Sequence, residues 1–182
     1  MNEAPSTLLL CVDLQPGFLK AIPSGDQVVQ RASFAIESAR GLGLPILFTE
    51  QVPGKLGGTA PALLALSGGA LSLGKDAFSA FGDDAIAAHI EALGVEHLLV
   101  CGIETPVCVY QTSLDALRLN YQVTLLSDGI GARRADDATV VLAELTRAGC
   151  HVLPSESVFY ALLHDAQHPF FRAYTSLVKK YG

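Results

Sequence analysis

Residues 97–119, HLLVCGIETPVCVYQTSLDALRL, contain the signals that decide the fold class. The run His97–Ile103 is short, continuous and rich in leucine and valine, as expected for a strand that is covered on both faces of a sheet. A helical pattern follows at once, from Thr105 to about Leu119, with Pro106 in its first turn. A buried strand that leads directly into a helix is typical of an α/β domain.

The same alternation continues in both directions along the chain. Further strands are expected at Thr7–Asp13, Pro45–Glu50, Gln122–Ser127 and Cys150–Pro154, and a weaker one at Ala70–Leu73. Further helices are expected at Asp26–Leu42, from Asp83 or Asp84 to Leu93, at Asp136–Ala148, from Ser155 onward, and within Phe170–Lys180. The Gly- and Pro-rich stretch Val52–Gly58 is expected to be a loop. The pattern predicts one domain over residues 1–182 with a three-layer, Rossmann-like α/β fold, in which helices cover both faces of a mostly parallel sheet.

Charge and hydropathy exclude several classes of protein. The 182 residues include 12 basic and 18 acidic ones, and the net charge of −6 argues against nucleic acid and anionic membranes as partners. No apolar run approaches the roughly 20 residues of a membrane span. Met1–Ser6 is too short and polar for a signal peptide, so we expect a cytoplasmic protein. The mean hydropathy of +0.38 is high for a soluble monomer, and we expect a homo-oligomer that acts on a small molecule.

Three reactive side chains fall at the carboxyl ends of predicted strands, where open parallel sheets bind their ligands. Asp13 ends the first strand, Lys75 follows the weak one, and Cys108 lies in the first helical turn after the strand that ends at Ile103. Each has a structural explanation by itself: a turn-forming aspartate, a solvated lysine, a buried cysteine. Together they supply a base, an orienting charge and a nucleophile.

The position of Cys108 predicts an activated thiol. A helix N-terminus stabilises a thiolate through its dipole and its free N–H groups, and a nearby ammonium adds to the effect. We therefore expect the pKa of Cys108 to be lowered, and the same N–H groups to be able to bind an oxyanion. The other cysteines, Cys11, Cys101 and Cys150, lie in or beside predicted strands and are expected to be buried there.

Five segments give the chain a specific resemblance. DLQPGF at 13–18, KDAFSAF at 75–81 and GIETPVCV at 102–109 resemble the three signature segments of the isochorismatase-like cysteine hydrolase superfamily, in the family's order. TEQVP at 49–53 and QTSLD at 111–115 further resemble the short isochorismatase-domain-containing branch of that superfamily.

The resemblance implies a catalytic triad of Asp13, Lys75 and Cys108. It also implies a cis peptide bond between Ile103 and Glu104, which orients the backbone N–H groups of Glu104 and Cys108 as an oxyanion hole. The residues that it suggests for the substrate pocket are Gln15, Phe18, Gln51, Phe78 and Thr105. Nicotinamidases of the superfamily carry an Asp-x-His…His metal site, which this sequence lacks, so neither a metal nor another cofactor is expected.

The favoured function is hydrolysis of an amide or related C–N bond of a small metabolite through a thioester. A catalytically idle member that binds a metabolite or a protein is one alternative, and isochorismatase-type hydrolysis of a vinyl ether is another, although Cys108 speaks against it. A nucleotide- or flavin-binding protein is disfavoured because Arg134 replaces the third glycine after Gly129-Ile130-Gly131, which we expect to be a surface loop near a site shaped by Asp128. His164 and His168 are expected to be exposed and not to bind zinc.

Overall fold

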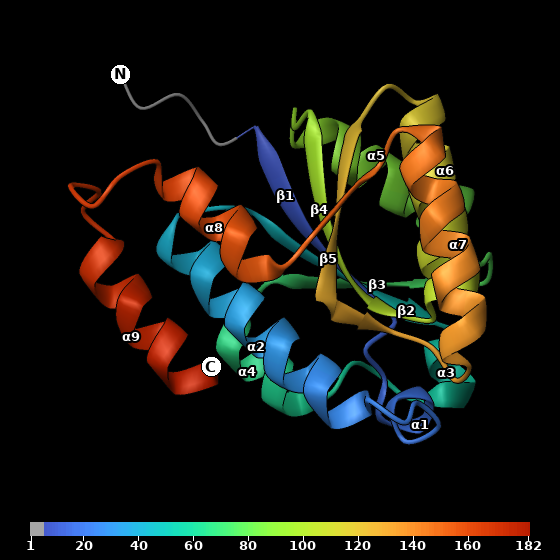
Figure 1. The fold of residues 1–182 in the computed structure, drawn as a ribbon. Coiled ribbons are helices and arrows are strands. Elements are labelled where there is room, and N and C mark those ends of the chain that lie inside the picture. Colours follow the sequence, from blue (N-terminus) through green and yellow to red (C-terminus); the bar gives the residue numbers. More distant parts are fainter. Residues whose placement is uncertain (1–5) are drawn as a thin grey trace.

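The computed structural model describes residues 6–182 and contains a six-stranded, wholly parallel sheet in the order β3-β2-β1-β4-β5-β6 (Figure 1). Its strands are β1 Thr7–Val12, β2 Ile46–Gln51, β3 Leu71–Lys75, β4 His97–Ile103, β5 Gln122–Gly131 and β6 His151–Leu153. The predicted fold class is confirmed. Residues 1–5, which carry most of the expectation about a signal peptide, lie outside the described residues.

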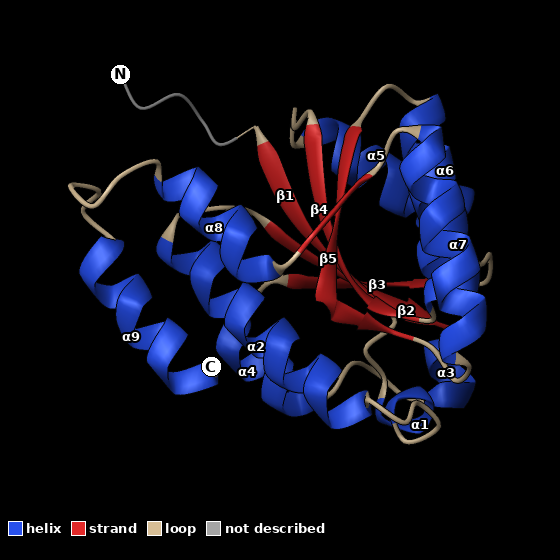
Figure 2. Cartoon of the chain, viewed as in Figure 1, coloured by secondary structure: helices blue, strands red, loops and turns tan. Residues whose placement is uncertain are grey.

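Helices cover both faces of this sheet (Figure 2). On one face lie α2 Gly25–Gly41, α4 Pro61–Ser67, α8 Ser155–Leu163 and α9 Phe171–Tyr181. On the other lie α5 Asp84–Ala92, the single π-helical turn η2 Thr105–Val109, α6 Tyr110–Arg118 and α7 Ala135–Ala148. Three short elements complete the fold: α1 Pro16–Leu19, α3 Pro53–Leu56 and the 3₁₀ turn η1 Ala80–Gly82. Within residues 6–182 no helix combines the length and apolar character needed to cross a bilayer.

The central strands supply both halves of the core. Leu9 and Cys11 of β1 pack beneath α2, whereas Leu8, Leu10 and Val12 face the opposite helices. Because alternate side chains of a strand point to opposite faces, a strand covered on both sides must be apolar at every position. Burial of the three strand-associated cysteines, Cys11, Cys101 and Cys150, is confirmed.

Two connections differ from the prediction. Gly129–Gly131 is not a surface loop but the end of β5, which extends past a register irregularity opposite Val100 and Gly102. The last glycine packs closely, since a Cβ there would lie 2.8 Å from Val28 of α2. The expected loop over Val52–Gly58 contains the short helix α3.

The strand order reverses direction between β1 and β4. The chain leaves β1 for β2 on one side and returns through β4 on the other, which is the topological switch point where open α/β sheets bind ligands. Gly102 sits at this point with φ 121°, and a Cβ there would lie 2.0 Å from the Val12 carbonyl oxygen. Only glycine allows the two strands to approach so closely at their carboxyl ends.

Candidate active site

A buried ion pair joins the ends of β1 and β3. Asp13 directly follows β1 with φ 51°, and its Oδ2 lies 2.8 Å from Nζ of Lys75, the last residue of β3. The side chains are at most 1% exposed. A charge removed from water in this way requires a partner and further hydrogen bonds.

Both side chains of the ion pair make such additional hydrogen bonds. Thr49 of β2 donates its hydroxyl to Asp13 Oδ1 at 2.8 Å. The Lys75 ammonium has four acceptors around its three protons: Asp13, the Gln51 side-chain oxygen at 2.6 Å, and the carbonyl oxygens of Ala77 at 3.2 Å and Phe78 at 3.1 Å. Lys75 is therefore a buried ammonium held by hydrogen bonds, and the alternative explanation of Lys75 as a solvated surface lysine is wrong.

Gln51 connects this ion pair to Cys108. The β2–β3 register places Gln51 beside Lys75, and its Oε1 lies 3.8 Å from Cys108 Sγ. Its Nε2 donates to the Asp76 carbonyl at 2.8 Å, which fixes the orientation of the amide. Gln15 accepts a hydrogen bond from the Gln51 backbone N–H at 2.7 Å. The sequence suggested Gln51 only as a pocket residue, because its contact with Lys75 depends on strand register.

The expected lowering of the Cys108 pKa is wrong. Burial, followed by the negative charge of Asp13, raises the pKa of this thiol to about 12, and the opposing effect of Lys75 is smaller. Cys108 is only 7% exposed in its π-helical turn. At neutral pH it is therefore a protonated thiol beside a carboxylate.

The backbone at the start of η2 faces the same site. The Ile103–Glu104 peptide bond is cis. The Glu104 carbonyl accepts from the N–H groups of Val107 at 3.0 Å and Val109 at 3.2 Å, on either side of Cys108. Glu104 and Cys108 both line the cavity described next.

A cavity of about 290 Å³ opens over Cys108. Phe18, Gln51 and Phe78 line it, together with residues that the sequence did not suggest for the pocket: Ala21, Ile22, Ile103, Val107 and Arg133. Ile103 ends β4 and Val107 lies in η2, whereas Ala21, Ile22 and Arg133 lie in connections whose position no local sequence pattern reveals.

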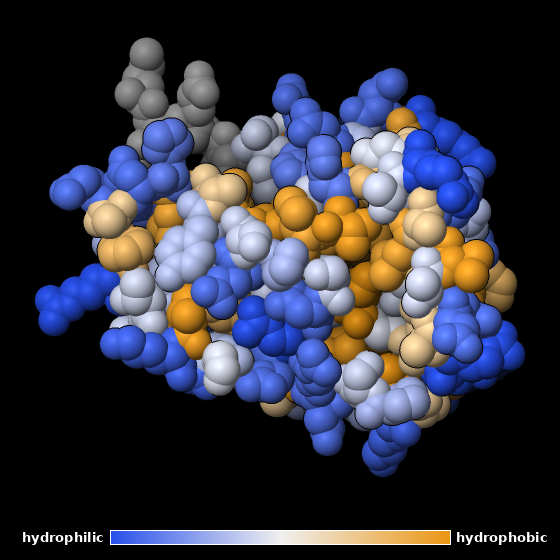
Figure 3. Space-filling model, in the orientation of Figure 1, coloured by the Kyte–Doolittle hydropathy of each residue, from blue (hydrophilic) through white to orange (hydrophobic). Residues whose placement is uncertain are grey.

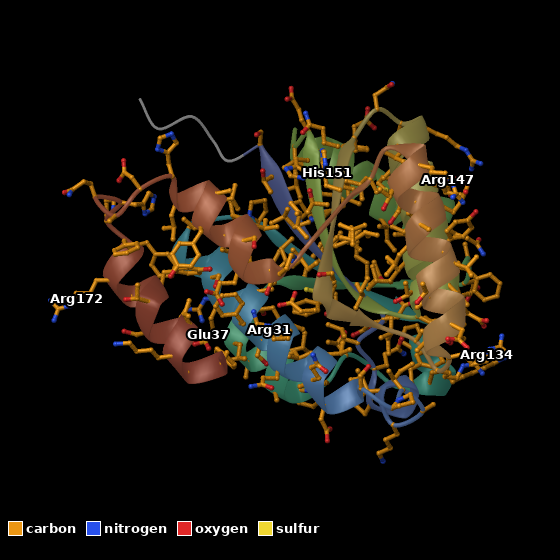
Figure 4. All side chains as sticks on the ribbon, in the orientation of Figure 1. Arg31, Glu37, Arg134, Arg147, His151 and Arg172 are labelled. Atoms are coloured by element: carbon orange, nitrogen blue, oxygen red, sulfur yellow. The ribbon has the colours of Figure 1, made fainter. Side chains whose placement is uncertain are left out.

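Three expectations about the surroundings of the site are wrong. Gln15 does not line the cavity, because it is fully buried and donates to the carbonyl oxygens of Gln51 and Gly57. Thr105 does not line the cavity because it is buried and donates its hydroxyl to the Gly131 carbonyl at 3.0 Å. Asp128 does not line the cavity either but binds Arg31 at 2.7 Å, and Figure 4 shows Arg31 on α2.

Metal ligands do not gather in the part of the chain that the structure describes: no group of three His, Cys, Asp or Glu side chains there could hold an ion. The side chain of His164 is 92% exposed.

Comparison with known proteins gives consistent matches over almost the whole chain. The family model for the Isochorismatase domain matches residues 7–157. Isochorismatase domain-containing protein 2A of Mus musculus is 35% identical over 176 residues, which cover 96% of this chain and 84% of the mouse protein. The chain spans only 61% and 63% of the length of the isochorismatase domain-containing protein 1 relatives from Salmo salar and Danio rerio.

Solved structures share the fold. A structure described as MAR1 ribonuclease from Caenorhabditis elegans has a TM-score of 0.89 and 27% identity, covering 98% of this chain and 91% of that one. The YcaC gene product of Escherichia coli, described as an octameric hydrolase of unknown specificity, has a TM-score of 0.83 and 20% identity, covering 100% of this chain and 97% of that one.

Proposed function

Since the chain belongs to the isochorismatase domain family, whose fold is that of a hydrolase, we propose that it is a cysteine-dependent hydrolase of a small metabolite. The bond cleaved is an amide or related C–N bond, and the intermediate is a thioester on Cys108. The buried Lys75–Asp13 pair carries this proposal, because it holds a carboxylate beside a thiol at the base of a cavity.

The mechanism follows from the protonation state of the thiol. With a pKa of about 12, the thiolate of Cys108 is populated at pH 7 only on the order of one part in 10⁵. The proton must therefore pass to Asp13 as sulfur attacks the substrate carbonyl, in general-base catalysis. Lys75 keeps the Asp13 carboxylate in place throughout.

The remaining steps use groups around the same cavity. The backbone N–H groups of Glu104 and Cys108 bind the oxyanion of the tetrahedral intermediate. Asp13 returns its proton to the departing amine, and the C–N bond breaks to leave a thioester. Water, deprotonated by Asp13, then attacks the thioester and regenerates the Cys108 thiol.

Charge and cavity size support a metabolite and not RNA, the substrate class in the name of the nematode neighbour. The chain has a net charge of −6, whereas proteins that bind nucleic acid present basic surfaces. A cavity of about 290 Å³ with largely apolar walls fits a small organic molecule.

We further propose that the chain forms a homo-oligomer. Figure 3 shows apolar surface alongside α7, where Val140 is 68% exposed, and Leu153 of the edge strand β6 is 44% exposed. Apolar side chains of this kind favour contact with another copy. Sedimentation equilibrium that shows only monomer at micromolar concentration would contradict this proposal.

A substrate screen tests the proposed chemistry. Small amides, ureides, carbamoyl compounds and RNA oligonucleotides are incubated with the wild-type protein and with Cys108→Ala. We expect turnover of a C–N compound by the wild type and only a residual rate with Cys108→Ala, and an acyl adduct on Cys108 of the wild type by mass spectrometry after acid quenching. Equal turnover by Cys108→Ala would refute the nucleophile.

A further inference from the structure

Arg133 is the basic side chain among the residues that line the cavity over Cys108. It lies between β5 and α7, whereas the buried Lys75 ends β3, on the other side of the β1–β4 switch point in the strand order. Its side chain is 62% exposed. The cavity therefore has one fixed charge pair at its base and a second pair, Arg133 with Glu104, nearer to solvent.

Contacts with Glu104 fix Arg133 in place without using all its donors. The Arg133 Nε donates to Glu104 Oε2 at 2.9 Å, and the Arg133 backbone N–H donates to Oε1 at 3.1 Å. Within residues 6–182 the two Nη groups have no protein acceptor. A guanidinium has five N–H donors in a rigid fork, so the Nη edge remains available to a planar acceptor.

The other charges of the cavity are already compensated. Asp13 accepts from Lys75 and Thr49, and both oxygens of Glu104 accept from Arg133. A cationic ligand would find no free carboxylate there. An anionic ligand would find the Nη edge of Arg133.

Apolar side chains make up much of the cavity wall. Phe18, Ile22 and Val107 are among the lining residues, and these side chains offer no hydrogen bonds. The part of a ligand that lies against these walls, between groups bound at Cys108 and at Arg133, is therefore expected to be apolar.

We infer that Arg133 is a specificity-determining residue that binds a carboxylate of the substrate. The substrates are then small amides in which a short apolar segment separates the scissile carbonyl from a carboxylate. The identity of the scissile bond rests on the proposed function, whereas binding of a carboxylate by Arg133 is independent of it.

Arg134 provides a matched control. It is the next residue, its side chain is 79% exposed, and it pairs with Asp137 of α7. Figure 4 shows it at the start of α7, extending away from the molecule. It lines a neighbouring hollow but not the cavity over Cys108.

The experiment compares two alkylating probes of equal size on the full chain. N-(iodoacetyl)-β-alanine ends in a carboxylate, and N-(iodoacetyl)-β-alaninamide ends in a neutral amide. The rate of Cys108 alkylation by each is measured by mass spectrometry at pH 9 in low salt. Both probes attack the same thiol, so its pKa cancels in the ratio of the two rates.

We expect Arg133→Gln to lower the anion-to-neutral rate ratio about five- to tenfold, as for a charge-assisted bond to a partly exposed guanidinium. Arg134→Gln is expected to leave the ratio within about twofold of wild type, and 0.5 M NaCl to reduce the wild-type ratio. Glutamine retains an N–H donor for Glu104, so the fold should persist, as thermal melts will verify.

Two results would overturn the inference: an unchanged ratio in Arg133→Gln, or equal losses in the two variants, which would mean a general surface effect. Failure of the proposed function looks different. In that case no C–N substrate is turned over, while the alkylation ratio still depends on Arg133.

Discussion

Replacement of Asp13 by asparagine should increase the thiolate population of Cys108 and yet lower the turnover of substrate. The Asp13 charge is the second largest cause of the raised thiol pKa, and Lys75 opposes it. Removal of that charge therefore lowers the pKa and increases the thiolate population at neutral pH. The same change removes the base that accepts the thiol proton during attack.

The magnitudes follow from electrostatics. Two unit charges on the order of 5 Å apart, in an effective dielectric constant of about 20, interact by about 3 kcal/mol. This corresponds to at most about 200-fold more thiolate, and solvent near Cys108, which is 7% exposed, reduces it towards tenfold. Loss of a general base lowers turnover by about 10²- to 10⁴-fold.

The assay is iodoacetamide alkylation of Cys108 between pH 6 and pH 10, with a thermal melt of each variant. In the wild type the rate should rise with pH over the whole range, because the pKa of about 12 lies above it. In Asp13→Asn the rate at pH 7 should be about ten- to a hundredfold higher, while substrate turnover falls. A rate at pH 7 that is unchanged or lower, in a protein that melts cooperatively, would refute this account of the thiol.

Three further predictions concern the same site. Lys75→Ala should destabilise the protein by about 3–5 kcal/mol, because it leaves the Asp13 carboxylate buried without its partner, whereas Lys55→Ala on exposed α3 should change the melting temperature little. Once a substrate is known, the double variant Asp13→Asn with Cys108→Ala should turn it over little more slowly than Cys108→Ala alone, since the residues act as one unit; additive losses in kcat/KM would contradict this. Turnover should also survive exhaustive chelation, and its loss with restoration by Zn²⁺ or Fe²⁺ would show that the Thr49–Val52 segment was misinterpreted.

The elements of the fold could be predicted because their signals are local. A strand such as His97–Ile103 and the helical turn after it are visible in the residues themselves. The carboxyl ends of such strands also indicated Asp13, Lys75 and Cys108, which the structure gathers at the β1–β4 switch point. The relative order of the strands is not a local property, so the sequence did not predict it and the structure was needed to establish it.

The missed features depend on register and packing. Gln51 reaches Lys75 because β2 pairs with β3 in one register, and a slip by one residue would point its side chain to the other face. Arg133 reaches the cavity because β5 extends beyond its predicted end. The expectation for the Cys108 pKa failed because a helix-terminus argument omits burial and the charge of Asp13.

The bond between Lys75 and the Phe78 carbonyl has a consequence for the divergence of this site. The backbone carbonyl of Phe78 accepts a hydrogen bond from the Lys75 ammonium at 3.1 Å, while Phe78 also lines the cavity and is 53% exposed. Replacement of that side chain changes the shape offered to a ligand and leaves the acceptors of Lys75 as they are. Position 78 is thus one at which related chains can acquire new ligand preferences by single substitutions, and a first choice for directed evolution.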